Sequence, residues 1–148
     1  MSFDDWQERY ELGIPEIDRD HRILFDLIGQ LHDAHAAGHG VERLDYVFQV
    51  LHDYVQTHFA HEEALFAASG YAQAEPHKQA HRRFTGELDG LYRHYRAAGN
   101  PRICIELLGM LNNWWHFHVL EDDAEFGRQW RQAHPPQIQR SSTDSRLE

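Results

Sequence analysis

The sequence predicts an all-α protein, an antiparallel up-down-up-down four-helix bundle preceded by an irregular N-terminal arm. Apolar residues recur at spacings of three and four through most of the chain, and no segment alternates apolar and polar residues as a strand would. Short links rich in glycine and proline separate the periodic segments, which places consecutive helices side by side and antiparallel. The chain has 148 residues, enough for one substantial core.

Residues 1–17 mix aromatic and charged side chains and include Gly13 and Pro15, so we expect an irregular arm that packs across the bundle. Asp18 is then a plausible N-cap of the first helix, because a short carboxylate can accept hydrogen bonds from the unpaired N–H groups of a helix start. The apolar stripe of this helix reaches Leu31, and Gly38 marks its end.

The second helix is expected from about Val41 to Ala68, with Gly70 just beyond it. Pro76 suits the first turn of a third helix. On the third helix, residues spaced alternately by four and three form a single seam of the kind that packs against neighbouring helices. The seam consists of His77, His81, Phe84, Leu88, Leu91 and Tyr95.

Asn100 and Pro101 predict the N-cap and the first position of a fourth helix, which should run to about Trp130. From His134 onward the chain loses its periodicity and becomes polar. We therefore expect one domain over residues 1–131 and a disordered tail over residues 132–148.

Composition excludes several classes of partner. The net charge of -10 argues against nucleic acid and against an anionic membrane surface. No apolar run approaches the ~20 residues that span a bilayer, and the acidic start of the chain shows no secretory signal. Cys104 is the only cysteine, so no intramolecular disulfide can form, and a cytoplasmic location is expected. We also expect a monomer.

Residues that bind metals interrupt the apolar stripes of all four helices. His58 and Glu62 lie four apart and share one face, where an unpaired buried carboxylate would be costly without a metal ion. The candidate ligands are His21, His58, Glu62, His77, His81, His118 and Asp123. Asp123 is the exception, because five residues after His118 it lies about 140° round a regular helix. It can reach the same site only if the helix is tilted or loosened there.

Five imidazoles and two carboxylates exceed the four ligands of a tetrahedral zinc ion. They suit two first-row ions bridged by the carboxylates, and imidazole combined with carboxylate favours iron.

The motifs, taken in order, resemble hemerythrin, specifically its single-domain bacterial type. They are Asp18-x-x-His21, His58-Phe59-x-x-Glu62-Glu63, Gly70-Tyr71, His77-x-x-x-His81-x-x-Phe84 and Trp114-x-x-x-His118-x-x-x-x-Asp123, and they extend over roughly residues 6–130. The resemblance implies a non-haem di-iron centre that binds O2 reversibly, with Glu62 and Asp123 bridging the two Fe ions together with an oxo or hydroxo group. It assigns His77, His81 and His118 to one iron, and His21 and His58 to the other.

The resemblance also implies an O2 pocket, formed by Trp114, Trp115, Phe25 and Val119. Trp115 stands where the family usually has leucine, and Val119 where it usually has isoleucine. We expect these changes to affect how ligands reach the iron rather than whether iron binds. Glu121 is expected to be solvated, as are the eight histidines outside the ligand set.

Two functions stay open at this point. One is reversible O2 binding for storage, transport or sensing, with azide as a ligand analogue, and the all-histidine terminal ligation favours it. The other is an enzyme of peroxidase or ferroxidase type that acts on peroxide, NO or ferrous iron, which a widened pocket or a nearby acid such as Glu121 would favour. A structural bundle with zinc, or with no metal, is a third and weaker possibility.

Overall fold

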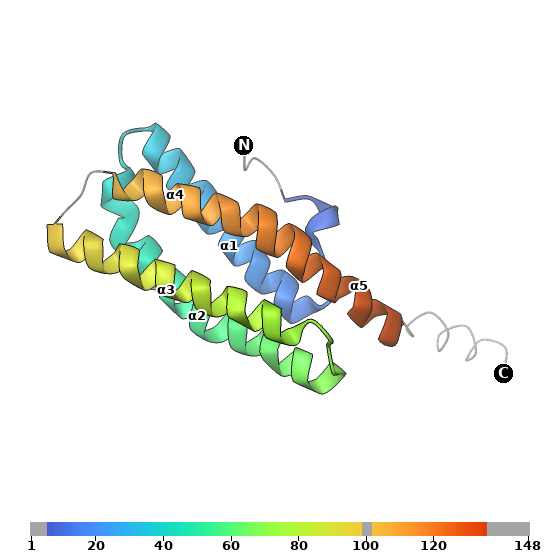
Figure 1. The fold of residues 1–148 in the computed structure, drawn as a ribbon. Helices are drawn as coiled ribbons and strands as arrows, with labels where there is room; N and C mark the ends of the chain where they lie inside the picture. Colours follow the sequence, from blue (N-terminus) through green and yellow to red (C-terminus); the bar gives the residue numbers. More distant parts are fainter. Residues whose placement is uncertain (1–5, 99–101, 136–148) are drawn as a thin grey trace, which may run out of the picture.

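Four helical rods lie side by side in the computed structural model, which describes residues 6–98 and 102–135 (Figure 1). The first three rods are α1 (Pro15–Ala36), α2 (Gly40–Ser69) and α3 (Ala74–Ala98). The fourth rod is continuous and joins α4 (Ile103–Asn113), a π-helical segment η2 (Trp114–Asp123) and α5 (Ala124–Ala133). A 3-10 turn, η1 (Glu8–Tyr10), precedes α1, and no strand occurs in the described ranges. The predicted four-helix bundle is confirmed.

Most helix ends fall close to their expected positions. α2 ends at Ser69, and Gly70 follows with a positive φ of 65°, a conformation that glycine adopts without steric cost. α5 ends at Ala133, slightly beyond the expected Trp130. The predicted cap at Asn100 and Pro101 lies outside the described residues, and so does most of the predicted tail, so the domain boundaries stay predictions.

The first helix begins earlier than expected. α1 starts at Pro15, a position where proline is favoured because its missing N–H would have no partner within the helix. Asp18 therefore lies inside the first turn, and its prediction as N-cap was wrong. Its carboxylate instead accepts hydrogen bonds from the backbone N–H groups of Leu12, at 2.7 Å, and Gly13, at 3.1 Å. Asp18 thus fastens the arm to the start of α1.

The arm packs across the bundle, as predicted. Tyr10 is buried, and its ring centroid lies 5.3 Å from that of Trp115 and 5.8 Å from that of Phe25. Trp6 meets Phe25 edge to face at 5.6 Å. The arm therefore packs against Phe25 and Trp115, two of the residues that were assigned to the pocket.

Two clusters of buried apolar residues fill the bundle and leave a polar level between them. The larger includes Leu24, Phe25, Phe59, Phe84, Trp114, Trp115 and Val119, and the smaller consists of Leu12, Ile14, Ile17, Phe66, Tyr71 and Phe126. The candidate ligands stand between the clusters on every rod; on α1, His21 follows Ile17 and precedes Leu24. Both sides of the polar level are therefore closed to water by apolar packing.

None of the helices in the described ranges combines the length and the apolar character that a bilayer crossing requires.

Candidate metal centre

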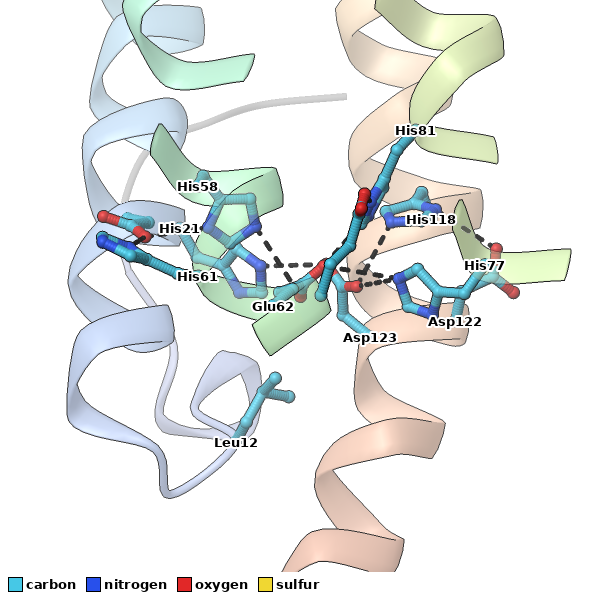
Figure 2. A network of polar contacts seen from close by, with 12 residues as sticks. Leu12, His21, His58, His61, Glu62, His77, His81, His118, Asp122 and Asp123 are labelled. Carbon is cyan, nitrogen blue, oxygen red and sulfur yellow. Dashed lines mark hydrogen bonds and ion pairs between the residues drawn. The ribbon is translucent and has the colours of Figure 1, made fainter. Parts of the chain in front are cut away.

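Seven buried polar side chains meet at the level between the two clusters (Figure 2). They are the seven candidate ligands His21, His58, Glu62, His77, His81, His118 and Asp123. Each is at most 5% exposed, and no other histidine or carboxylate in the described part of the chain is buried. All four rods contribute, so the cluster exists only in the folded bundle.

The donor atoms form two overlapping groups. One group contains His77, His81 and His118, the other contains His21 and His58, and Glu62 and Asp123 belong to both. Within each group one nitrogen or oxygen atom per residue can be chosen so that all lie within 4.8 Å of one another. Each group therefore supplies enough donor atoms, close enough together, to hold one metal ion.

The two shared carboxylates direct one oxygen atom to each group. Asp123 Oδ1 lies 2.8 Å from His77 Nε2 and 3.2 Å from His118 Nε2, whereas Oδ2 lies 2.9 Å from His21 Nε2. Glu62 Oε1 lies 3.4 Å from His77 Nε2, whereas Oε2 lies 3.6 Å from His58 Nε2. This is the arrangement that a carboxylate needs in order to bridge two cations.

Several atoms at this convergence lie close to one another, yet among the described residues none of their contacts has the geometry of a hydrogen bond. They are His58 Nε2, Glu62 Oε2, His77 Nε2, His118 Nε2 and Asp123 Oδ1. Buried polar atoms without partners are costly and rare in folded proteins. Imidazole nitrogens and carboxylate oxygens are also the ligands that first-row metal ions prefer, so the residues present fit a metal centre.

The buried carboxylates dominate the electrostatics of the side chains alone. Burial would raise the pKa of Asp123, but His118, His21 and His77 hold it well below its usual range. Burial would lower the pKa of His77, but Asp123 and Glu62 raise it to about 10. Burial would also lower the pKa of His118, but Asp123 and Asp122 together raise it to about 9. The cluster therefore attracts positive charge, which protons or metal ions can supply.

Asp123 reaches the centre because the fourth rod is π-helical from Trp114 to Asp123. A π-helix closes hydrogen bonds between residues five apart, so His118 and Asp123 come onto the same face. The sequence spacing required the helix to be loosened here, and η2 meets that requirement. π-Helical segments are rare and are frequently found at functional sites.

Three further carboxylates, to which the sequence analysis gave no role, contact the outer nitrogen of a candidate ligand. The Nδ1-to-oxygen pairs are His58 with Asp20 at 2.9 Å, His81 with Glu63 at 2.9 Å and His118 with Asp122 at 3.3 Å. An Nδ1–H that donates to a carboxylate fixes the tautomer and leaves Nε2 free for a metal. Each of these acids is the sequence neighbour of a candidate ligand, and that adjacency could have identified them.

Removal of one outer carboxylate should weaken metal binding without removing a ligand. We expect Asp20→Ala to lower iron affinity about 10- to 100-fold, because His58 would lose the group that orients it. Competition with a chromogenic chelator measures the affinity. Asp26→Ala, at an exposed position on the same helix, is the matched control. Equal affinities in the two variants would remove Asp20 from the centre.

The aromatic residues assigned to the pocket lie beside different groups of ligands. Trp114 stacks on His118, with ring centroids 3.7 Å apart and planes at 11°. Trp115 is fully buried, and its ring lies 6.3 Å from that of His21 and 5.3 Å from that of Phe25. Val119 is also buried. Trp115 and Phe25 therefore stand next to the two-histidine group, whereas Trp114 belongs to the three-histidine group.

Trp115→Leu should open a path to the two-histidine group. We expect azide to associate faster with the iron-loaded variant, because the indole fills the space beside His21, while iron content stays unchanged. The cavity should cost about 2 kcal/mol of stability. Stopped-flow mixing measures the association rate, and Trp130→Leu, towards the far end of the fourth rod, is the control. An unaltered rate would exclude Trp115 from ligand access.

The remaining polar candidates stay outside the centre. Glu121 is exposed, as expected. The apolar neighbour that immediately precedes His118, Phe117, has a side chain that is 63% exposed. None of the eight other histidines is buried; His52 and His116 are half-buried, and the other six are exposed. His61 alone contacts the outer carboxylates, with its Nδ1 3.1 Å from Asp20 Oδ2.

Fold and site together define a class of protein: a four-helix bundle whose core carries a buried histidine and carboxylate cluster able to hold metal. The chain belongs to the hemerythrin family, since residues 12–130 match the family described as "Hemerythrin HHE cation binding domain". The resemblance seen in the sequence motifs is thereby confirmed.

Individual relatives agree with this assignment. The chain is 35% identical over 121 residues to the Bacteriohemerythrin of Pseudomonas aeruginosa (strain LESB58), covering 82% of this chain and 77% of the relative. It is 33% identical over 135 residues to the Bacteriohemerythrin of Stenotrophomonas maltophilia (strain R551-3), covering 91% and 86%. It is 32% identical over 87 residues to Myohemerythrin-1 of Phascolopsis gouldii, covering 58% and 66%.

Proposed function

We propose that this protein binds O2 reversibly at a di-iron centre held by the seven buried ligands. The observation that carries the proposal is the double use of Glu62 and Asp123, each of which directs one oxygen to the three-histidine group and the other to the two-histidine group. Two ions, one beside each group, would use both oxygen atoms of each shared carboxylate.

The unequal number of histidines supports a site for an external ligand. His77, His81 and His118 supply three terminal ligands on one side, and His21 and His58 supply two on the other. The two-histidine side therefore has one coordination position fewer filled by the protein. When bound, two iron ions supply two electrons to O2 and recover them on release.

The surrounding residues hold the ligands still and keep water out. The Phe59 ring stacks on His81, with centroids 3.9 Å apart and planes at 2°, and Phe66 lies 4.6 Å from His77. Outer carboxylates fix the imidazole tautomers from behind. An apolar shell of this kind limits the access of water and protons, which favours release of intact O2 over its further reduction.

Reversible binding is favoured over an enzymatic role. Glu121, the nearby acid that would have supported turnover of peroxide, is exposed to solvent and is not among the buried ligands. The terminal ligands are all histidines, whereas oxidising di-iron enzymes rely on more carboxylates.

We also propose a cytoplasmic monomer, because the exposed large apolar side chains are scattered over several helices and the single cysteine suits a reducing compartment.

The test is metal analysis of anaerobically purified protein, followed by optical spectra in air before and after addition of azide. We expect two irons per chain, a spectrum that azide changes, and recovery of the initial spectrum when O2 is removed. One zinc ion per chain, or an iron protein that azide leaves unaltered, would contradict the proposal. Continuous consumption of peroxide without reversible O2 release would support the enzyme instead.

A further inference from the structure

Tyr54 is a buried phenol beside the centre, and its side chain is not one of the seven candidate ligands. It precedes His58 by one turn of α2, and the two rings stack with centroids 4.7 Å apart and planes at 14°. The side chain is 6% exposed, and its hydroxyl has no hydrogen-bond partner among the described residues. Because buried hydroxyls are nearly always paired, this one calls for a ligand.

A second buried donor lies next to it. Trp114 Nε1 likewise has no hydrogen-bond partner within the described ranges. Both rings pack on Phe59, with centroids 5.8 Å from it for Tyr54 and 5.6 Å for Trp114. The Trp114 N–H is directed at the Tyr54 hydroxyl oxygen without meeting full hydrogen-bond geometry, so the O–H of Tyr54 is a donor left unused. Two neutral donors therefore lie close together above the polar level, one over each histidine group.

The charges that act on the Tyr54 hydroxyl come mainly from the two shared carboxylates. Asp123 and Glu62 contribute the largest electrostatic interactions with it. The hydroxyl therefore belongs to a side chain that stacks directly on a candidate ligand and feels the charge of both shared carboxylates. His58, on which the phenol stacks, belongs to the two-histidine group, the side that has a coordination position left for an external ligand.

We propose that the Tyr54 hydroxyl, with the Trp114 N–H beside it, donates a hydrogen bond to the small ligand held on the His58 side of the centre. This inference rests on the proposed function and deepens it. Two donors with no basic partner select ligands whose outer atom carries a lone pair and negative charge, such as azide or reduced O2. Tyr54 is then a specificity-determining residue, and the donors retain the bound ligand without supplying it with a proton.

The test compares Tyr54→Phe with Tyr46→Phe in the iron-loaded protein. Tyr46 lies on the same helix and is 51% exposed, so its hydroxyl removal is a matched control. We expect the azide dissociation constant to rise about tenfold in Tyr54→Phe, the size of one hydrogen bond, and to stay unchanged in Tyr46→Phe. Iron content should equal that of the unmodified protein in both variants.

Two further measurements separate a hydrogen bond to the ligand from a structural role. The vibrational bands of bound azide should shift in deuterated water in the unmodified protein and not in Tyr54→Phe. The metal-free Tyr54→Phe protein should melt at the same temperature as the unmodified one or higher, because it lacks an unpaired buried hydroxyl.

The outcomes distinguish this inference from the function on which it rests. Equal azide affinity in Tyr54→Phe and the unmodified protein would overturn it and assign the hydroxyl to a buried water molecule. Loss of iron from Tyr54→Phe would also overturn it, because Tyr54 would then support His58 rather than the ligand. Failure of the unmodified protein to bind iron or azide would instead contradict the proposed function.

Discussion

Glu62→Ala is expected to lose both irons rather than one. Glu62 contributes an oxygen to each group of ligands, so its removal leaves neither group with its full set of donors. It also leaves His58, His77 and His81 buried without the carboxylate that they face. Breaking such a buried set by removing one partner should cost about 3 kcal/mol of stability in addition to the stabilisation by metal.

Metal analysis and thermal unfolding of the purified variant measure both effects. Glu42→Ala is the control, since Glu42 lies on the same helix and forms an exposed ion pair with His39. His58→Ala should abolish the centre as well, because it removes one of the two histidines of its group. Full iron content and unchanged melting in Glu62→Ala would mean that the shared carboxylate does not bridge two ions.

The bundle, and the burial and convergence of the seven candidate ligands, could be predicted from the sequence because most of their signals are local. His58 and Glu62 lie four residues apart, and a regular helix places such residues on one face whatever the rest of the chain does. Asp123 was predicted to reach the site only on the condition that the fourth helix is tilted or loosened near His118. A π-helix has no simple residue signature, so the five-residue interval from His118 indicated a distortion without showing its form.

The start of α1 was missed because an aspartate near a helix start is compatible with two different local structures. An aspartate that accepts backbone N–H bonds can cap a helix from outside or hold a preceding turn from within the helix, and both need the same residue. Asp18 does the second, since Leu12 and Gly13 fold back onto it. Pro15 carried the correct signal for the first helical position.

The outer carboxylates were missed because they do not follow the apolar stripe. Asp122 has a side chain that is 54% exposed, so the hydrophobic pattern places it on the solvent face. It still reaches His118, because the outer nitrogen of an imidazole whose Nε2 points into the core faces outward. Similarly, Trp114 and Trp115 are sequence neighbours but point to different groups of ligands, since successive residues of a helix project in different directions.

The metal-free protein should become less stable as the pH rises from about 6.5 towards 10. The pKa of His77 is raised from 6.5 to about 10 by Asp123 and Glu62 against the opposing effect of burial, so the folded state holds this proton more tightly than the unfolded state. Its contribution is complete below pH 6.5 and is lost as the pH rises through about 10. His118, with a pKa of about 9, adds a contribution of the same sign.

The carboxylates act in the opposite direction at low pH. The pKa of Asp123 lies well below its ordinary value of 3.8, despite burial, because His118 and other histidines stabilise its charge. Its contribution is present above that ordinary value and is lost as the pH falls through the lowered pKa. The metal-free protein should therefore be most stable between the titration ranges of the free carboxyl and free imidazole groups.

Iron should abolish the decline on the alkaline side. Metal ions replace the protons of His77 and His118, so the loaded protein has no such protons to lose when the pH rises. Melting temperatures of the metal-free and iron-loaded proteins are measured between pH 5 and pH 9.5. The difference between the two melting temperatures should be largest at the alkaline end. Metal-free His77→Gln should show a shallower decline, and His94→Gln, at an exposed position on α3, should keep the full one. Parallel curves with and without iron would show that these imidazoles do not exchange protons for metal.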